Sequence, residues 1–219
     1  MNRSGHVIAI DGPAGSGKST LAIGLAARLG LPYVNTGLMY RALTARALAR
    51  GLDLADGPGL ASAMAWVRFS LSTEVPPVIW VDGEAPSAEL TSDAVEAAVS
   101  EVARHLEVRA AMRDAQRALG QEGAVMEGRD IATVVFPDAD LKIFLDATEE
   151  ERASRRVAER GGREDVGQDL VQRDEKDARV NPFVPADGAV TIDTSSRDAE
   201  EVLAEALRLA AERGIVAAD

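Results

Sequence analysis

One glycine-rich octapeptide, GPAGSGKS at residues 12–19, constrains the fold of this chain more than any other feature. It follows the apolar run VIAI at residues 7–10, and an amphipathic stretch follows it up to residue 29. In the spacing G-x-x-x-x-G-K-[ST], backbone amides curl around phosphate oxygens, the lysine reaches the outer phosphates, and the hydroxyl lies where Mg²⁺ binds. A chance glycine-rich turn is the alternative, but the expected strand and helix flank the motif. The sequence therefore predicts a strand, a phosphate-binding loop and a helix, in that order.

We expect the loop to hold a nucleotide phosphate, with the helix dipole directed at the anion. Lys18 is the predicted cation, and Ser19 is the predicted Mg²⁺ ligand. The residues assigned to nucleotide binding are Gly12, Pro13, Ala14, Gly15, Ser16, Gly17, Lys18, Ser19 and Thr20.

The composition is that of one soluble α/β domain. A chain of 219 residues can bury a substantial core, and no apolar run has the length of a membrane span. There is no cysteine for a disulfide or thiolate site, and two histidines leave little scope for a histidine metal centre. The net charge of −12 argues against a general nucleic-acid or membrane binder. We expect a cytoplasmic monomer that binds neither nucleic acid nor membranes.

The charges are nevertheless unevenly spread. Residues 1–50 carry six Lys or Arg and one acid, whereas residues 51–100 carry one Arg and eight acids. The chain has 21 Arg and three Lys, and guanidinium groups suit bidentate phosphate recognition. A genome-wide bias in composition would explain the same excess of Arg over Lys. Only the positions of the arginines therefore indicate phosphate binding.

Short apolar runs alternate with amphipathic stretches, which predicts a parallel sheet covered by helices on both faces. The predicted strands are residues 7–10, 32–34, 124–126, 141–145 and 189–192. The predicted helices are residues 19–29, 38–50, 92–119 with a break, 148–160, 165–178 and 198–213. Residues 66–71 and 78–82 interrupt this rhythm as two short antiparallel strands near Pro76 and Pro77, which indicates a small β-rich insertion.

Several polar clusters lie where such a sheet binds ligands. Thr36 begins a helix after the second strand, and Arg41 lies one turn inside it, which predicts an anion site; an ordinary cap at Thr36 with a surface Arg is the alternative. Arg129 and Asp130 follow the strand at 124–126, and pairing with each other is the alternative there.

Two further clusters stand on predicted helices. Ser100 and Arg109 are nine residues apart, and a bend would bring both to one cleft; a purely structural role is the alternative. Arg152 and Arg156 share one helix face, and a glycine-rich zone separates them from Arg173 and Arg179. These arginines indicate a lid that closes on phosphate, with ordinary salt bridges as the alternative.

Taken together, the clusters resemble bacterial cytidylate kinases over nearly the whole chain. The most specific segments are IAIDGPAGSGKS at 8–19, TGLMYR at 36–41, GRDIATVVFP at 128–137 and KIFLDA at 142–147 leading to ERASRR at 151–156. The resemblance implies a P-loop kinase fold with a five-stranded parallel sheet. It also implies a core of residues 1–36, 120–155 and 183–219, a monophosphate-binding insertion at 37–119 and a short mobile lid at 156–182, within one domain of 1–219.

The same resemblance implies transfer of the γ-phosphoryl group of ATP to CMP or dCMP, with Mg²⁺. Lys18, Arg129, Arg152 and Arg156 would act on the transferring group. The implied acceptor residues are Thr36, Arg41, Arg129 and Arg179 toward the phosphate, Arg173 and Asp177 toward the ribose, and Ser100, Arg109 and Asp130 toward the base.

This chain departs from the family pattern at four places. Asn35 and Glu127 stand where the family usually has Asp, and Thr91 stands where Arg is common. The run at 173–182 is about two residues shorter than usual, which leaves the placement of Arg179 less secure. A kinase for another monophosphate and a nucleotide-dependent switch remain the competing hypotheses; the guanine-reading Asn-Lys-x-Asp motif of GTPase switches is absent from the sequence.

Overall fold

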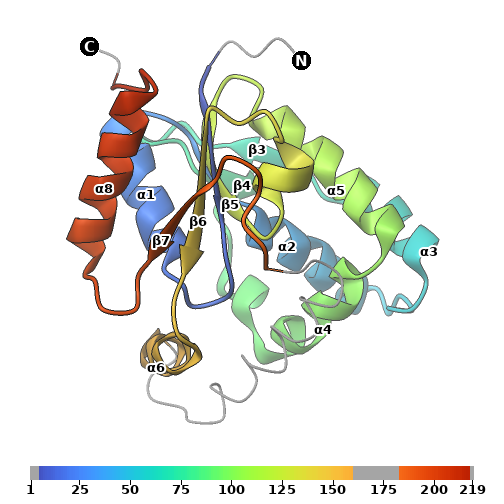
Figure 1. The fold of residues 1–219 in the computed structure, drawn as a ribbon. Coiled ribbons are helices and arrows are strands. Elements are labelled where there is room, and N and C mark those ends of the chain that lie inside the picture. Colours follow the sequence, from blue (N-terminus) through green and yellow to red (C-terminus); the bar gives the residue numbers. More distant parts are fainter. Residues whose placement is uncertain (1–4, 160–182, 218–219) are drawn as a thin grey trace.

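A five-stranded parallel sheet forms the centre of the computed structural model, which describes residues 5–159 and 183–217 (Figure 1). The strand order is β2-β5-β1-β6-β7, and every neighbouring pair is parallel. The strands are β1 (Val7–Asp11), β2 (Tyr33–Asn35), β5 (Ala124–Gly128), β6 (Leu141–Asp146) and β7 (Val190–Asp193). Each overlaps its predicted range, so the predicted parallel sheet is confirmed.

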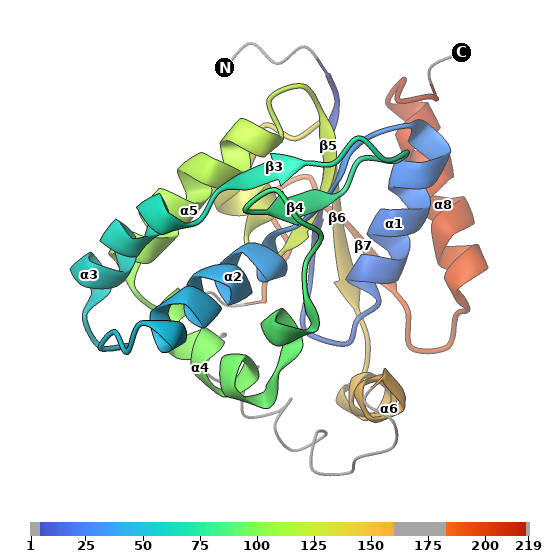
Figure 2. The same ribbon diagram turned by 180° about the vertical axis from the view of Figure 1, so that it is seen from behind.

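Helices cover both faces of this sheet. On one face lie α1 (Lys18–Leu29) and α8 (Ala199–Glu212), and on the other lie α2 (Thr36–Ala49) and α5 (Leu106–Leu119) (Figures 1 and 2). Successive residues of β1 point to opposite faces, so Ile8 and Ile10 pack with the α1–α8 side while Val7 and Ala9 pack with the α2–α5 side. This two-sided burial explains why the central strand reads as a continuous apolar run.

The predicted break in the helix over 92–119 is confirmed. Helix α4 (Asp93–Ala103) ends before Arg104 and His105, and α5 begins at Leu106. Helix α6 (Glu149–Glu159) follows β6, whereas the helix predicted at 165–178 lies outside the described residues. Among the helices that the structure describes, none combines the length and hydrophobicity needed to cross a bilayer.

The predicted antiparallel hairpin is present as β3 (Phe69–Leu71) and β4 (Ile79–Val81). It lies on the same side of the sheet as α2 and α5 (Figure 2). The residues around it are more helical than the sequence indicated: α3 (Gly57–Ser62) and the 3₁₀ turns η1 (Ala63–Trp66) and η2 (Ala88–Thr91) flank the hairpin. Helix α3 forms because the Asp56 side chain accepts a hydrogen bond from the Gly59 amide and Pro58 fits the first turn.

Candidate active site

The phosphate-binding loop joins the end of β1 to the start of α1, as predicted. Gly12 has a φ of 149°, and a Cβ there would lie 2.3 Å from the Leu145 carbonyl oxygen. Gly15 has a φ of 74°, and a Cβ there would lie 2.8 Å from the Arg152 carbonyl oxygen. Only glycine fits both positions, because backbone from two other segments closes directly on the loop.

Two of the predicted cations lie against this loop. The Lys18 ammonium donates to the Pro13 carbonyl over 2.5 Å. Arg152, on α6, donates from Nη1 to the Ala14 carbonyl over 3.1 Å and from Nε to the Ala147 carbonyl over 3.3 Å. The structure therefore brings Lys18 and Arg152 to one loop. Arg156 also belongs to α6, but its side chain lies outside the described part of the structure.

Oxygen ligands suited to Mg²⁺ stand beside the loop. The Ser19 hydroxyl donates over 3.0 Å to one oxygen of Glu127, a carboxylate only 4% exposed. The Tyr33 hydroxyl donates over 2.5 Å to the other oxygen, and burial raises the pKa of Tyr33, which keeps the phenol protonated. The described residues hold no cluster of three acidic, histidine or cysteine side chains that would bind a metal alone. A hydroxyl beside a buried carboxylate is a donor set that fits Mg²⁺ bound together with nucleotide phosphates and water.

Asp11, at the end of β1, connects the loop to the segment after β5. Its two carboxylate oxygens accept hydrogen bonds from the amides of Ile131 and Ala132, over 2.9 and 2.8 Å. These amides begin η3, a single π-helical turn (Ile131–Val135). Burial raises the pKa of Asp11 to about 6, although both amide donors oppose the shift. The sequence analysis gave Asp11 no role, although an acid at the end of a buried strand indicates a functional or structural contact there.

Arg109 and Asp130 meet, as the predicted base-reading site requires. Arg109, on α5, donates from Nη2 to an Asp130 carboxylate oxygen. Burial raises the pKa of Asp130, and the nearby guanidinium opposes the shift. Ser100, the third predicted member, lies on α4, which packs against α5. The structure thus brings Arg109 to Asp130, and it places Ser100 on the neighbouring helix.

Arg41 also contacts a carboxylate that sequence reasoning missed. From α2 it donates through Nη1 to Glu96 on α4 and, over 3.4 Å, to the Leu90 carbonyl. Thr36 is buried, and its hydroxyl donates over 2.7 Å to the Glu127 carbonyl. The side chain that caps α2 is Asn35, which accepts from the Leu38 amide. The alternative of an ordinary cap at Thr36 is therefore wrong.

The remaining predicted acceptor residues are less fully described. The Arg129 guanidinium lies 4.7 Å from the centre of the Phe183 ring, a distance typical of a cation–π contact. Arg173, Asp177 and Arg179 lie outside the described residues, and so does the predicted lid from residue 160 onward.

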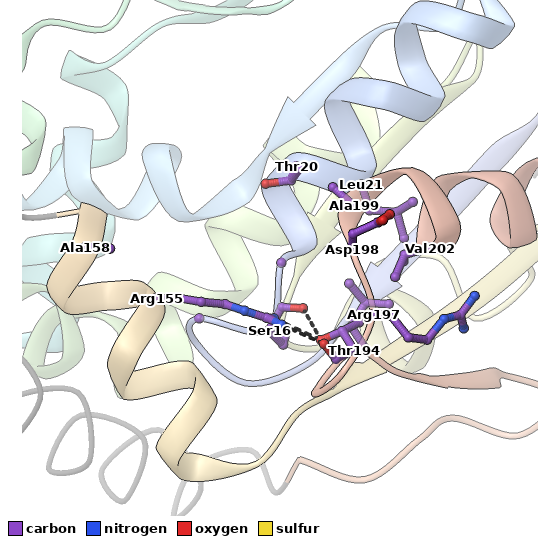
Figure 3. Close-up of a pocket in the computed structure, with 13 residues that line it drawn as sticks. Ser16, Thr20, Leu21, Arg155, Ala158, Thr194, Arg197, Asp198, Ala199 and Val202 are labelled. Carbon is purple, nitrogen blue, oxygen red and sulfur yellow. Dashed lines mark hydrogen bonds between the residues drawn. The ribbon is translucent and has the colours of Figure 1, made fainter.

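A pocket of about 340 Å³ opens beside the phosphate loop, and sequence reasoning did not find it (Figure 3). Residues 15–17 of the loop, Arg155 of α6 and Thr194 after β7 lie on its walls. Arg155 donates to the Thr194 hydroxyl over 3.0 Å and to the Thr194 carbonyl over 2.6 Å. The apolar side chains on the walls include Leu21, Leu145 and Val202. The position of Thr194 at the carboxyl end of a parallel strand was the available signal.

Comparison with known proteins places this geometry in a family. The family model described as cytidylate kinase matches residues 8–212. Cytidylate kinase of Pelotomaculum thermopropionicum is 47% identical over 207 residues, which are 90% of this chain and 92% of that protein. Cytidylate kinase of Herpetosiphon aurantiacus is 46% identical, covering 93% of each chain, and that of Rhodococcus opacus is 42% identical, covering 97% and 98%. The chain belongs to the cytidylate kinase family.

Proposed function

We propose that this protein transfers the γ-phosphoryl group of ATP to CMP or dCMP, giving ADP and CDP or dCDP. The observation that carries the proposal is the adjacency of two sites at one edge of the sheet. The phosphate loop leaves β1 after Asp11, and β5 ends beside it at Gly128, directly before Arg129 and Asp130. A donor held by the loop and an acceptor held after β5 would therefore face each other. The similarity to proteins named cytidylate kinase supports this assignment.

The donor side joins the phosphate loop to the pocket beside it. Loop amides, Lys18 and Arg152 would hold the ATP phosphates, and Ser19 with Glu127 would hold Mg²⁺ through its water shell. The pocket between the loop, Arg155 and Thr194 is the natural place for the adenine base, because apolar walls and polar edges converge there.

The acceptor side matches cytosine. Cytosine presents acceptors at O2 and N3 and a donor at N4, so an Arg donor and an Asp acceptor complement it. Uracil reverses the polarity at N3 and at position 4, which would leave the partly buried Arg109 or Asp130 without a matching group on the base. Arg41 and Arg129, with Arg173, Asp177 and Arg179 of the predicted lid region, would hold the phosphate and the ribose.

The reaction would then depend on position and charge rather than on a general base. Mg²⁺, when bound, supplies charge neutralisation at the β- and γ-phosphates. Lys18 and Arg152 would stabilise negative charge on the transferring group. Residues 156–182 are assigned the role of a lid, which would exclude water that otherwise hydrolyses ATP. We assign the core to residues 1–36, 120–155 and 183–219 and the acceptor insertion to 37–119. The protein acts as a cytoplasmic monomer and binds neither nucleic acid nor membrane.

A coupled ADP-release assay with CMP, dCMP, UMP and AMP as separate acceptors tests the proposal. We expect rapid release with CMP and dCMP, slower release with UMP, and little with AMP. Equal turnover of AMP would assign the protein to another monophosphate. Slow hydrolysis that no acceptor accelerates would favour the switch hypothesis.

A further inference from the structure

The buried hydroxyl of Tyr33 has no part in the reaction described above, yet it contacts the acid beside the phosphate loop. Tyr33 is 8% exposed, and its hydroxyl donates over 2.5 Å to one carboxylate oxygen of Glu127. The second oxygen of Glu127 accepts the Ser19 hydroxyl over 3.0 Å. Asn35 in turn donates from its amide to the Tyr33 oxygen over 3.2 Å. Four side chains from β2, β5 and α1 therefore form one hydrogen-bonded chain that ends at Ser19.

Strand register explains why these side chains meet. Strand β2 pairs with β5 in parallel, with Asn35 opposite Glu127 and Tyr33 opposite Val125. Residues two apart in a strand point to the same face, so Tyr33 and Asn35 lie on one face with Glu127. The length of the tyrosine ring lets its hydroxyl reach diagonally to the Glu127 carboxylate. A shorter or apolar side chain at residue 33 could not make this contact.

Glu127 needs such a partner. It carries one more methylene, and therefore one more rotatable bond, than an aspartate at the same place. The carboxylate is almost fully buried, and an oxygen left there without a donor is unfavourable. Asn35 is an amide, so Glu127 is the single acid among these four residues. The orientation of one carboxylate therefore decides how Ser19 is held.

We propose that Tyr33 is a positioning residue: its hydroxyl, held by Asn35, fixes the Glu127 carboxylate so that its second oxygen orients Ser19 toward the Mg²⁺ that accompanies ATP. This role rests on the proposed function, because Ser19 is a metal ligand only if MgATP is the donor. Tyr33 itself touches neither nucleotide. Partners of this kind, one step removed from a metal, change metal affinity about 10–100-fold when they are removed.

Calorimetric titration with a non-hydrolysable ATP analogue, with and without Mg²⁺ and without any acceptor, tests the proposal. We expect Tyr33→Phe to leave the metal-free affinity within about twofold of the wild type and to reduce the Mg²⁺-dependent gain in affinity about tenfold. Tyr40→Phe is the matched control, since Tyr40 lies on α2 near Asp130 rather than beside Glu127. It should leave the gain unchanged. An unchanged gain in folded Tyr33→Phe would overturn the proposal.

A second variant covers the case in which Tyr33→Phe does not fold. Asn35→Ser keeps a good helix cap for α2 but is too short to reach the Tyr33 hydroxyl. It should reduce the Mg²⁺-dependent gain about threefold, as a weaker form of the same loss. If the gain stays at the wild-type value in Asn35→Ser, Tyr33 is not held in the way proposed.

The outcome is separable from that of the proposed function, because the titration uses no acceptor and no turnover. If the wild type phosphorylates CMP but the Mg²⁺-dependent gain in affinity is the same in Tyr33→Phe, the positioning role alone is refuted. A wild type inactive on CMP, with a gain that depends on residue 33, would refute the choice of acceptor alone.

Discussion

The proposed donor and acceptor sides of the site hold their cations in different ways. On the donor side, Lys18 and Arg152 donate to carbonyls of the phosphate loop itself, at Pro13 and Ala14. On the acceptor side, Arg41 and Arg109 donate to carboxylates, those of Glu96 and Asp130. The donor cations are thus held in part by the backbone of the loop that they serve, whereas a phosphate that reaches Arg41 must share that guanidinium with Glu96.

The different partners of the two sets of cations suggest different roles, with the donor side acting on the rate of transfer and the acceptor side on the choice of acceptor. Backbone carbonyls help to fix the donor cations in place, which suits stabilisation of a charged transition state. A carboxylate beside Arg41 and another beside Arg109 weaken the general attraction for anions and leave discrimination to the pattern of donors and acceptors. Substitutions on the donor side should therefore change rate most, and substitutions on the acceptor side should change acceptor preference most.

Removal of the Lys18 ammonium should have the largest effect. We expect Lys18→Met to lower kcat about 10²–10³-fold, roughly 3–4 kcal/mol in the barrier, because a preorganised charge contact to the transferring group is lost. The melting temperature should change little. Lys142→Met is the control, because Lys142 donates only to the Asp187 carbonyl at an exposed site. CMP phosphorylation at a near-normal rate in Lys18→Met would contradict the assignment.

Asp11 connects the two sides and should be visible in the pH dependence of stability. Its pKa is raised from 3.8 to about 6 in the folded protein, so between these values the folded state binds more protons than the unfolded state. The contribution of Asp11 to the free energy of unfolding should therefore fall as the pH rises from about 4 to 6, by about 3 kcal/mol. Urea unfolding of the wild type and Asp11→Asn across this range measures the effect. Parallel curves for the two proteins would show that Asp11 has an ordinary pKa.

Asp130→Asn should act on the acceptor alone. We expect kcat/KM for CMP to fall about 10–100-fold, because the charged acceptor for the cytosine amino group becomes a neutral amide that can also present a donor, while KM for ATP stays within about twofold. The ratio of CMP turnover to UMP turnover should also fall. Asp114→Asn, at an exposed position of α5 beside Arg113, is the control. It should change neither kcat/KM for CMP nor KM for ATP. A change confined to the kinetic parameters for ATP would contradict the assignment of Asp130 to the acceptor side.

The smallest effect is expected from the acid that shares Arg41. Glu96→Gln keeps a hydrogen-bond acceptor of the same size but removes the negative charge, so KM for CMP should fall a few-fold, about 1 kcal/mol or less. Glu101→Gln, which alters an exposed pair on the same helix, should leave KM unchanged. A higher KM in Glu96→Gln would mean that the charge of Glu96 orients Arg41 rather than competing for it.

The sequence predicted the sheet and the loop because their signals are local. A strand buried on both faces is a continuous apolar run, and the phosphate loop has fixed glycine spacing. Helix α3 was missed because the sequence Gly57-Pro58-Gly59 is more typical of a turn, and the cap from Asp56 decides otherwise. The π-helical turn η3 was missed for a different reason, since its first amides are held by Asp11, which is far away in the sequence.

The site was predictable to a similar extent. Arg109 and Asp130 were expected to contact the same base, and they form an ion pair with each other. Glu96, Tyr33 and Thr194 were not anticipated, because their partners come from other elements of the fold; of the three, Thr194 alone had a signal, its position directly after a parallel strand. The roles given to the predicted residues remain proposals that the variants above test.

The most direct test of the two-site arrangement is transfer of label from γ-³²P-ATP in the presence of CMP, followed by separation of the products. The proposed reaction places the label in CDP, in amounts equal to the ADP formed, with little inorganic phosphate. Label that appears only as inorganic phosphate, at a rate independent of CMP, would contradict the account.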